Sequence, residues 1–543
     1  MTQPNTRVGA VSKAYGHQTA KDLYSCLAKT AGLNPKSTAF STDEKKMAYH
    51  ELIHSVDRAA DMFWQSGTRP RDTVAIVLRN SLEFIIAYFA LAKIGAVAVP
   101  INYMVSKEDE ICYILENAKC KGVVTAKEFL PAYKGAKRRL DSLKFLIAAD
   151  PITDQNCSRY CAASLHPAGE HDVIDFWQHL KHARYHYQTR HVPVGEHAVV
   201  SILYTSGTTG HPKGVLLTHH NLIENAKASI QAMGPVRKDV FMALLPMFHT
   251  FSWTGNVIIP ILLGSKTFIV RSITPPGHWL AAMGREGVTV MVAVPQIYSV
   301  LAKEARGLKK FFLKLWSMRR LRLCVSGAAP LPHVIKHHFE KVFGLHILEG
   351  YGLTETSPVV TLTHPKAKKH GSVGKAIPGV KIRIMDEGGR HLGPGEEGEI
   401  CVWGPNITSG YHENPQATKE LFTGDGWLKT GDIGVLDLDG FLFIRDRKKD
   451  MVIIKGLKVF PAQIEQVITT HPGVQEAAVI GIPDGSGNET MKCFCVPKKD
   501  SRIDKTEIMS FIRANMDAYK RPREVEIVDS LPKNTMQKVL KRE

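Results

Sequence analysis

Helical and strand-like patterns alternate along the first part of the chain. Apolar residues recur at helical spacing over residues 49–66, and residues 73–78 form a continuous apolar run typical of a buried strand. A second helical pattern covers 81–95, and further strand-like runs follow at 96–101 and 122–125. Strands and helices that alternate in this way predict parallel sheets covered by helices.

The pattern changes after residue 370. Between 371 and 440, short runs that alternate apolar and polar residues, such as 381–385 and 398–402, are separated by glycine-rich turns. This pattern predicts a small β-barrel or a distorted sheet. Earlier in the chain, residues 150–198 are polar, rich in histidine and interrupted by proline, which predicts a loop-rich insertion.

The C-terminal segment predicts a compact α+β unit. We expect helices at 461–470 and 504–517, and strands at 451–454, 474–481, 491–497 and 524–528. A charged run at 446–450 precedes this unit and has the composition of a joint between domains. The chain is therefore predicted to be an α/β protein. Its large N-terminal domain, residues 1–446, would contain βα-layered parallel sheets plus a small β-barrel-like subdomain, and residues 447–543 would form a small mobile α+β C-terminal domain.

Length, charge and cysteine content narrow the class of protein. A chain of 543 residues is too long for one hydrophobic core, so two or more domains are expected. The formal charge of +18 occurs without any nucleic-acid-binding motif, so we expect no nucleic-acid partner and consider anionic small molecules or an anionic membrane surface instead. The nine cysteines include no C-x-x-C pair, and no signal-peptide pattern is present, which favours a cytoplasmic location. The longest apolar stretch, 84–101, contains Lys93, Gly95 and Pro100, so it predicts a buried helix and strand rather than a membrane span.

A loop rich in glycine and hydroxyl side chains is the clearest chemical motif. It follows the apolar run 199–203 and consists of Thr205, Ser206, Gly207, Thr208, Thr209 and Gly210, with Lys213 shortly after it. Such a loop can direct several backbone N–H groups and hydroxyls at a phosphate, and Lys213 adds a positive charge. The G-x-x-x-x-G-K-[ST] pattern of a Walker A loop cannot be aligned on it. The alternative is a mobile surface loop of ordinary composition.

This loop resembles the signature of the adenylate-forming superfamily, which includes acyl-CoA synthetases, adenylation domains of peptide synthetases and luciferases. The resemblance runs from about residue 20 to the C-terminus, and the later motifs occur in the family's order. These motifs lie at 245–249, 326–331, 350–356, 430–432, 455–465 and 531–538. The resemblance implies the fold described above and a reaction that joins an acid to AMP and then to a thiol.

The resemblance implies an ATP- and AMP-binding site built from the 205–210 loop and residues of later motifs. These later residues are Gly327, Ala328, Ala329, Glu349, Gly350, Tyr351, Gly352, Thr354, Asp432 and Arg447. Tyr351 would pack against adenine, Thr354 would bind phosphate, and Asp432 would accept hydrogen bonds from the ribose hydroxyls. Glu355 would hold Mg²⁺ as the metal ligand. The implied catalytic residues are Lys213, His249, Thr354, Glu355 and Lys538.

Other positions are implied to contact the acid and coenzyme A. His249, Trp253 and Gly327 would line the acyl pocket, with Trp253 as a gate; the alternative for His249 and for Trp253 is a packed core residue. Lys455 and Gly456 would line the tunnel for the pantetheine arm of coenzyme A. Lys449 occupies the family's hinge position, where many relatives carry aspartate. The residue before Lys538 is Gln537, whereas the family often has glycine there.

The sequence therefore predicts an ATP-dependent ligase that activates a medium- or long-chain fatty acid as acyl-AMP and transfers it to coenzyme A. Its expected partners are the fatty acid, ATP, Mg²⁺ and coenzyme A, and a homodimer is considered as the oligomeric state. Three alternatives stay open: an acyl-AMP ligase that loads a carrier protein, an aryl-CoA ligase, and a non-catalytic acyl-nucleotide-binding protein. The last would require broken catalytic positions, whereas Lys213, Glu355, Asp432, Arg447 and Lys538 are all present.

Residues 306–322 have the composition of a helix that lies on a membrane surface. The segment contains seven basic residues and no acidic residue. Its apolar residues recur at roughly helical spacing: Phe311, Phe312, Leu315, Trp316 and Met318. We expect peripheral contact with an anionic membrane through this segment; the alternative is an ordinary amphipathic helix that covers the core.

Overall fold

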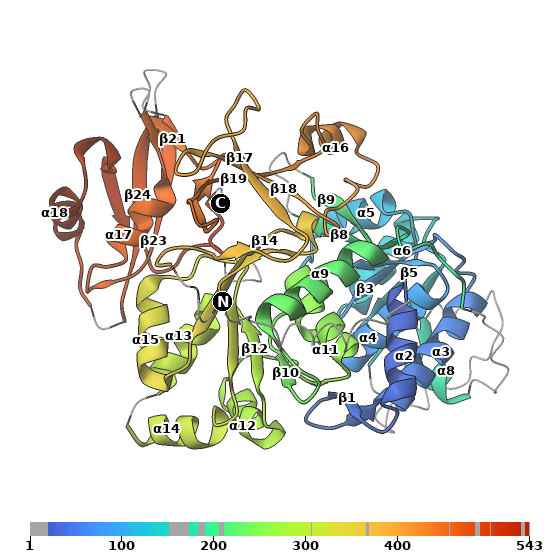
Figure 1. Ribbon diagram of the computed structural model, residues 1–543. Coiled ribbons are helices and arrows are strands. Elements are labelled where there is room, and N and C mark those ends of the chain that lie inside the picture. Colours follow the sequence, from blue (N-terminus) through green and yellow to red (C-terminus); the bar gives the residue numbers. More distant parts are fainter. Residues whose placement is uncertain are drawn as a thin grey trace, which may run out of the picture.

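The structure is a computed structural model of the chain (Figure 1). It describes residues 20–150, 173–182, 191–205, 211–305, 307–364, 367, 369–454, 457–483, 489–499, 501–533 and 538–541. The chain forms two large sheets whose strands are interleaved in the sequence, and then a smaller antiparallel sheet and a C-terminal unit.

The first large sheet has nine strands in the order β16-β15-β14-β13-β12-β10-β11-β1-β2. All neighbours from β14 to β1 pair in parallel, whereas the pairs at both ends of the sheet are antiparallel. The strands are β1 (Thr38–Ser41), β2 (Lys46–Ala48), β10 (Val240–Ala243), β11 (Lys266–Ile269), β12 (Val290–Ala293), β13 (Leu323–Ser326), β14 (Ile347–Gly352), β15 (Val359–Leu362) and β16 (Lys375–Ala376).

The second large sheet has seven strands in the order β7-β6-β5-β3-β4-β8-β9. Only β8 and β9 pair antiparallel, and the glycine-rich loop connects them. The strands are β3 (Thr73–Val77), β4 (Val97–Pro100), β5 (Cys120–Thr125), β6 (Phe145–Ala148), β7 (Val173–Asp175), β8 (Val199–Thr205) and β9 (Lys213–Thr218).

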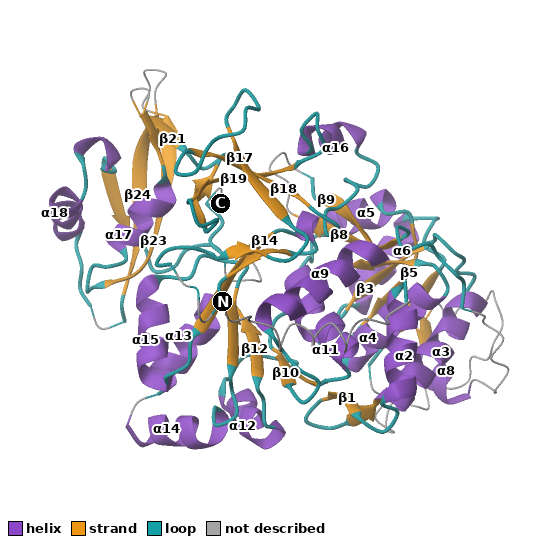
Figure 2. Cartoon of the chain, in the orientation of Figure 1, coloured by secondary structure: helices purple, strands orange, loops and turns teal. Residues whose placement is uncertain are grey.

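Helices cover both large sheets, as the alternating pattern predicts. α13 (Pro295–Glu304) and α15 (His333–Phe343) lie on one side of β12 and β14, and α9 (His219–Met233) and α11 (Ile259–Leu263) lie on the other (Figure 2). The remaining N-terminal helices are α2 (Leu23–Leu33), α3 (Tyr49–Gln65), α4 (Leu82–Lys93), α5 (Glu108–Asn117), α6 (Leu130–Arg139), α8 (Phe176–His182), α10 (Thr250–Trp253), the π-helix η2 (Thr254–Ile258) and α12 (Gly277–Glu286).

α4 holds the two large sheets together. Every residue of α4 except Glu83 is buried, because its sequence is apolar around the whole helix. The largest hydrophobic cluster joins α4 to β3 of one sheet and to β10 of the other. The one buried cation of α4, Lys93, is neutralised by Asp57, whose Oδ1 lies 2.9 Å from Nζ.

The smaller sheet has the order β17-β18-β19-β20 and is antiparallel throughout. Its register shifts between Glu399 and Cys401 and between Ile433 and Gly434, so it is the distorted sheet expected from the glycine-rich pattern. Its elements are β17 (Lys381–Met385), β18 (Glu397–Trp403), α16 (Pro415–Leu421), β19 (Leu428–Leu436) and β20 (Leu442–Arg447).

The C-terminal unit has a hydrophobic core of its own, formed by residues between Val452 and Val525. β23 and β24 pair antiparallel, and β25 joins β24 in parallel. Its elements are β21 (Val452–Ile454), β22 (Leu457–Val459), α17 (Pro461–Ile468), β23 (Val474–Pro483), β24 (Glu489–Pro497), α18 (Lys505–Asn515) and β25 (Glu524–Ile527). The predicted α/β class with a small α+β C-terminal unit is confirmed, and the domain boundary at residue 447 stays a prediction.

Two local expectations need correction. The expected insertion at 150–198 lies largely outside the described residues, but its 173–182 part forms β7 and α8 rather than a loop. Phe176 is fully buried, and the Trp177 indole donates to Glu83 Oε1 at 2.8 Å, so this part is packed against the N-terminal unit. The short strand β22 was not predicted.

Among the described residues, no helix combines the length and the apolar content needed to cross a membrane.

Candidate active site

A cavity of about 600 Å³ lies where the large sheets, the smaller sheet and the start of the C-terminal unit meet. Strand ends supply much of its wall: Thr205 ends β8, Gly327 and Ala328 follow β13, and Gly352 ends β14. Parallel α/β sheets bind ligands at the carboxyl ends of their strands, because the loops there leave a crevice. The cavity thus occupies the place at which this architecture predicts a site.

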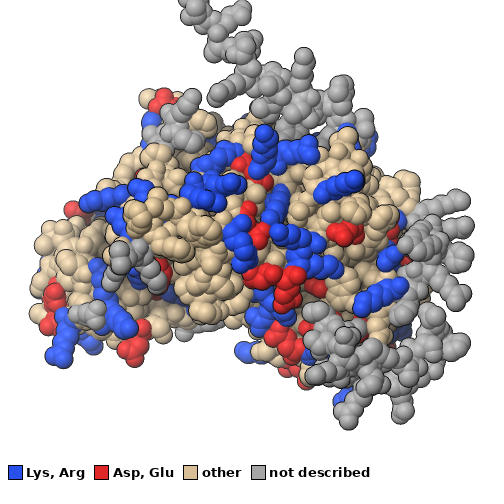
Figure 3. Space-filling view, turned by 90° about the horizontal axis from the view of Figure 1, so that it is seen from below, with Lys and Arg blue, Asp and Glu red and all other residues tan. Residues whose placement is uncertain are grey.

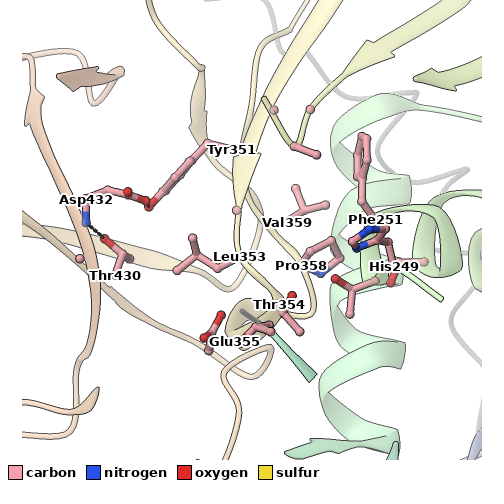
Figure 4. A pocket seen from close by; sticks show the side chains of 18 of the residues that line it. His249, Phe251, Tyr351, Leu353, Thr354, Glu355, Pro358, Val359, Thr430 and Asp432 are labelled. Atoms are coloured by element: carbon pink, nitrogen blue, oxygen red, sulfur yellow. Dashed lines mark hydrogen bonds between the residues drawn. The ribbon is translucent and has the colours of Figure 1, made fainter. Parts of the chain in front are cut away.

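The cavity has two chemically different ends. In Figure 4, Tyr351 points toward Asp432 on one side, while His249 and Phe251 face Pro358 and Val359 on the other. Charged side chains line the first side; five are basic (Lys213, Lys429, Arg447, Lys448 and Lys449) and four are acidic (Glu355, Glu399, Glu420 and Asp432). The second side has no charged side chain among the described residues that form its wall: Ser229, Met233, His249, Thr250, Phe251, Thr254, Gly255, Ile259, Val292 and Val325. One end suits a polyanion and the other an uncharged group.

Tyr351 and Asp432 are joined at the basic end. The Tyr351 hydroxyl donates to Asp432 Oδ2 at 2.7 Å, and Arg447 Nε lies 3.7 Å from Asp432 Oδ1. Burial raises the pKa of the Asp432 carboxyl, and the nearby Arg447 opposes that shift. Burial, followed by the charge of Asp432, raises the pKa of Tyr351 well above its usual value, so Tyr351 stays a hydrogen-bond donor. These contacts hold the carboxylate at the cavity wall.

Small residues shape the surface beside Tyr351. A Cβ on Gly327 would lie 2.8 Å from Phe251 Cζ, and a Cβ on Gly352 would lie 1.8 Å from the Pro358 carbonyl oxygen. Ala328 adopts a left-handed backbone with φ of 66°. No larger side chain fits at Gly352 without moving the backbone, so the glycines let the Pro358 carbonyl and the Phe251 ring pack closely in the cavity wall.

Glu355, Tyr411 and Lys213 form a linked group near the glycine-rich loop. Glu355 lies in a 3₁₀ turn, η4 (Thr354–Thr356), and its Oε1 accepts a hydrogen bond of 2.8 Å from the Tyr411 hydroxyl. Lys213 Nζ lies 5.3 Å from the centroid of the Tyr411 ring. Burial, then the charge of Glu355, raises the pKa of Tyr411. The carboxylate and the Thr354 hydroxyl are oxygen donors, which are the ligands that Mg²⁺ prefers.

Lys538 lies close to Arg447 and Asp432 at the basic end of the cavity. Burial and the charge of Arg447 lower the pKa of its ammonium group to about 8, and the carboxylates of Asp432 and Asp450 oppose this shift. Lys538 is not part of the described cavity wall, but its charge interacts with Asp432 and Arg447, which are. Burial also lowers the pKa of His249 to about 4, so its imidazole is neutral at physiological pH and leaves the second end uncharged.

Trp253 does not lie where its predicted role at the acyl pocket would place it, and that role stays a prediction. Its side chain is only 3% exposed and does not line the cavity among the described residues. The indole packs instead against three aromatic rings of α4, with centroid distances of 4.2 Å to Tyr88, 5.4 Å to Phe84 and 6.0 Å to Phe89. Phe251, which the sequence did not single out, faces the cavity beside Gly327. In this structure Trp253 packs in the core, which favours the alternative of a packed core residue.

The other predicted positions divide into three groups. Thr205, Lys213, His249, Gly327, Ala328, Gly350, Tyr351, Gly352, Thr354, Glu355, Asp432, Arg447 and Lys449 line the cavity. Ala329 and Glu349 are not part of its described wall, and Glu349 instead pairs with Lys336 on α15. Ser206, Gly207, Thr208, Thr209, Gly210, Lys455 and Gly456 lie outside the described residues.

Tyr411 was missed because it lies far along the chain from Glu355, in a turn with no motif of its own. A backbone pairing between Val215 and Tyr411 brings that turn to β9. A separate group of possible metal ligands, Glu196, His197 and His220, has donor atoms within 4.8 Å of one another. It does not contribute to the described cavity wall.

Known proteins share both the sequence and the architecture. The AMP-binding enzyme family matches residues 27–412, and the AMP-binding enzyme C-terminal domain matches residues 463–538. A long-chain-fatty-acid–CoA ligase of Salmonella typhimurium is 31% identical over 88% of this chain and 85% of its own length. A feruloyl-CoA synthase of Amycolatopsis sp is 32% identical over 95% of this chain and 96% of its own length.

A solved structure resembles the whole chain. ATP-bound MatB from Rhodopseudomonas palustris superimposes with a TM-score of 0.85 at 29% identity, covering 96% of this chain and 97% of that one. The match therefore includes the N-terminal sheets and the C-terminal unit together.

Proposed function

The chain belongs to the AMP-binding enzyme family and is an adenylate-forming acid–CoA ligase, and we propose that its acid is a medium- or long-chain fatty acid. ATP and coenzyme A are the other two substrates, and enzymes of this kind require Mg²⁺. The observation that carries the proposal is the uncharged end of the cavity. An alkyl chain needs only an apolar wall, whereas a second carboxylate on the acid would need a cation there.

The residues at the basic end support a division of labour in the first half-reaction. The acid carboxylate attacks the α-phosphate of ATP, the new P–O bond forms, and pyrophosphate leaves with the electrons of the broken P–O bond. We propose that Lys213, the 205–210 loop and Lys538 hold the phosphates in line for this attack. Tyr351 would contact adenine, and Asp432 would bind the ribose hydroxyls in place of one of its present partners.

Glu355 and Thr354 fit a site for Mg²⁺, since both offer oxygen donors at the phosphate end. When bound, the ion would neutralise charge on the phosphates. Tyr411 would position Glu355 through the hydroxyl hydrogen bond described above.

The second half-reaction requires the thiol of coenzyme A to reach the acyl carbonyl. The thiolate would form the new C–S bond and AMP would leave with the electron pair of the broken C–O bond. The charge of Lys538 interacts with those of Arg447 and Asp432, which line the cavity. We propose that this unit turns about a hinge at Lys449, so that Lys538 leaves and Lys455 and Gly456 line the route of the thiol.

An aryl acid is the main rival substrate, because a relative of similar identity is named feruloyl-CoA synthase. A role without catalysis has less support, because Lys213, Glu355, Asp432 and Arg447 all line the cavity; a carrier protein as the thiol partner stays an alternative. Pyrophosphate release should be measured with short, medium, long and aromatic acids, with and without coenzyme A. We expect the highest rates with medium and long alkyl acids and acyl-CoA as the product. A marked preference for an aromatic acid would refute the fatty-acid proposal and leave the ligase activity intact.

Contact with an anionic membrane is a separate proposal, which the choice of a fatty acid makes useful. Fatty acids concentrate in bilayers, since each buried CH₂ favours an apolar phase by about 0.8 kcal/mol. A ligase that collects its acid there would gain from a surface that binds lipid.

A further inference from the structure

A cluster of exposed apolar side chains lies on the short helix α14 (Gly307–Phe312) and the π-helix η3 (Leu313–Ser317) that continues it. These side chains are Phe311, 68% exposed, Phe312, 53%, Leu315, 55%, and Trp316, 42%. Together with the exposed cations Lys310, Lys314 and Arg319 they form what we call the aromatic–basic patch. The patch lies beside α12 at the lower edge of Figure 1, far from the labelled C-terminal unit.

Core packing accounts for only part of this segment. Leu313 and Met318 are buried, with 2% and 5% of their surface exposed, and both belong to the hydrophobic cluster behind β12 and β13. They anchor the segment and explain why it folds against the domain. The expectation that Met318 faces outward with the other apolar residues is therefore wrong. The four apolar residues of the patch face outward and contribute nothing to that cluster, so burial within this chain does not explain them.

The patch is held in one arrangement. Trp316 packs one edge on α12, where a Cβ on Gly284 would lie 2.3 Å from its indole, so only glycine leaves room for the ring. The rings of Phe312 and Trp316 are stacked with centroids 6.5 Å apart, and the Arg319 guanidinium lies 5.3 Å from the Trp316 ring. Aromatic rings fixed beside cations suit an interface in which one side is apolar and the other is charged.

The charged residues of this stretch of the sequence all have one sign. No acidic residue occurs between Glu304 and Glu340 in the sequence, and within the described residues no ion pair involves Lys310, Lys314 or Arg319. Figure 3 views the molecule from below, the side on which α12 and α14 lie, and both basic and acidic side chains lie over the middle of that face. These cations are thus available to an anionic surface.

We propose that the aromatic–basic patch is the surface through which this enzyme binds an anionic lipid bilayer. The apolar side chains enter the boundary between headgroups and acyl chains, and Lys310, Lys314 and Arg319 contact the anionic headgroups. The usefulness of this contact rests on the proposed function, because an alkyl acid is drawn from the same bilayer. The binding itself depends only on the patch.

The test is co-sedimentation of the full chain with vesicles of phosphatidylcholine alone and of phosphatidylcholine with phosphatidylglycerol. The wild type should sediment with the anionic vesicles at low salt and much less at high salt, because salt screens surface charge. Lys310→Glu with Lys314→Glu should lower the bound fraction at least tenfold. The matched control is Lys134→Glu with Arg138→Glu, two exposed residues at the same spacing on α6, and it should bind as the wild type does.

A second pair of variants tests the apolar part without touching Trp316. Phe311→Ser with Leu315→Ser should lose binding, whereas Leu438→Ser, at a residue 91% exposed elsewhere, should not. All variants should keep the wild-type rate with octanoate in the absence of vesicles, which shows that they are folded. If the wild-type protein ligates long-chain acids but does not sediment with anionic vesicles, the proposal that the aromatic–basic patch binds a bilayer is refuted and the proposed function stands. Equal binding to neutral vesicles, or a dimer that dissociates in the Phe311→Ser/Leu315→Ser variant while vesicle binding is absent, would also overturn it.

Discussion

At the scale of single residues, the basic end of the cavity is a network in which each charge depends on its neighbours. Asp432 contacts both Tyr351 and Arg447, and the same two charges, Asp432 and Arg447, act on Lys538 in opposite directions. Burial is the largest cause of the lowered pKa of Lys538. The cationic form of this lysine is therefore lost at a lower pH than in an exposed lysine.

This shift predicts a pH dependence of adenylate formation. Since the cationic Lys538 is proposed to stabilise the phosphates, kcat/KM for ATP in pyrophosphate release should be high below pH 8 and fall above the pKa of about 8. Lys538→Arg should lower the rate but extend the profile to higher pH, because a guanidinium stays charged. Lys541→Arg is the control, since Lys541 is paired with Glu465 at 2.7 Å. A wild-type decline that persists unchanged in Lys538→Arg would assign it to another group.

At the scale of elements, the run from α10 through η2 to α11 decides which aromatic residue faces the acid. Phe251 and Trp253 are two positions apart in α10, and at about 100° per residue they point to nearly opposite sides of the helix. The sequence shows both rings but not the rotation of this helix relative to the cavity. Packing against α4 sets that rotation, since Trp253 contacts Phe84, Tyr88 and Phe89.

The two aromatic residues should therefore give opposite results when truncated. Trp253→Ala should reduce the free energy of unfolding by about 3–5 kcal/mol, because it leaves a cavity in the core. Its preference among acids of different length should not change. Phe251→Ala should keep most of the stability and shift the preferred chain length, because the cavity widens beside Gly327. Denaturant unfolding and kcat/KM for a series of alkyl acids measure both effects. If Trp253→Ala has normal stability and an altered length preference, Trp253 acts as a gate of the acyl pocket, contrary to this prediction.

At the scale of the whole molecule, the pattern of apolar and polar residues predicted the parallel sheets and the C-terminal unit. The family resemblance also implied one site for Tyr351, Glu355 and Asp432, and all three line the cavity, although Asp432 lies 81 residues after Tyr351. The sequence could not predict contacts that depend on tertiary packing, such as the hydrogen bond between Tyr411 and Glu355 or the burial of Met318 in the core. The strand β7 and the helix α8 were missed because the polar, proline-rich residues around them mask a short apolar pattern.

The proposed turning of the C-terminal unit separates the two half-reactions. Lys538→Ala should abolish pyrophosphate release but leave thioester formation from supplied acyl-AMP largely intact. Gly456→Leu should do the reverse, because a side chain there would obstruct the route of the thiol. Both reactions are followed separately by pyrophosphate and by acyl-CoA. Folded variants that each lose both reactions equally would contradict two alternating arrangements.

The central claim is the identity of the acid, and kcat/KM across a series of acids tests it most directly. With ATP and coenzyme A saturating, we expect kcat/KM to rise from acetate through octanoate and to level off at dodecanoate or longer. The rise should be gradual, because an apolar pocket separates acids that differ by one methylene by only about 1–3 kcal/mol. Dodecanoate should exceed ferulate and benzoate by at least tenfold. A kcat/KM for ferulate or benzoate well above that for dodecanoate would contradict the account.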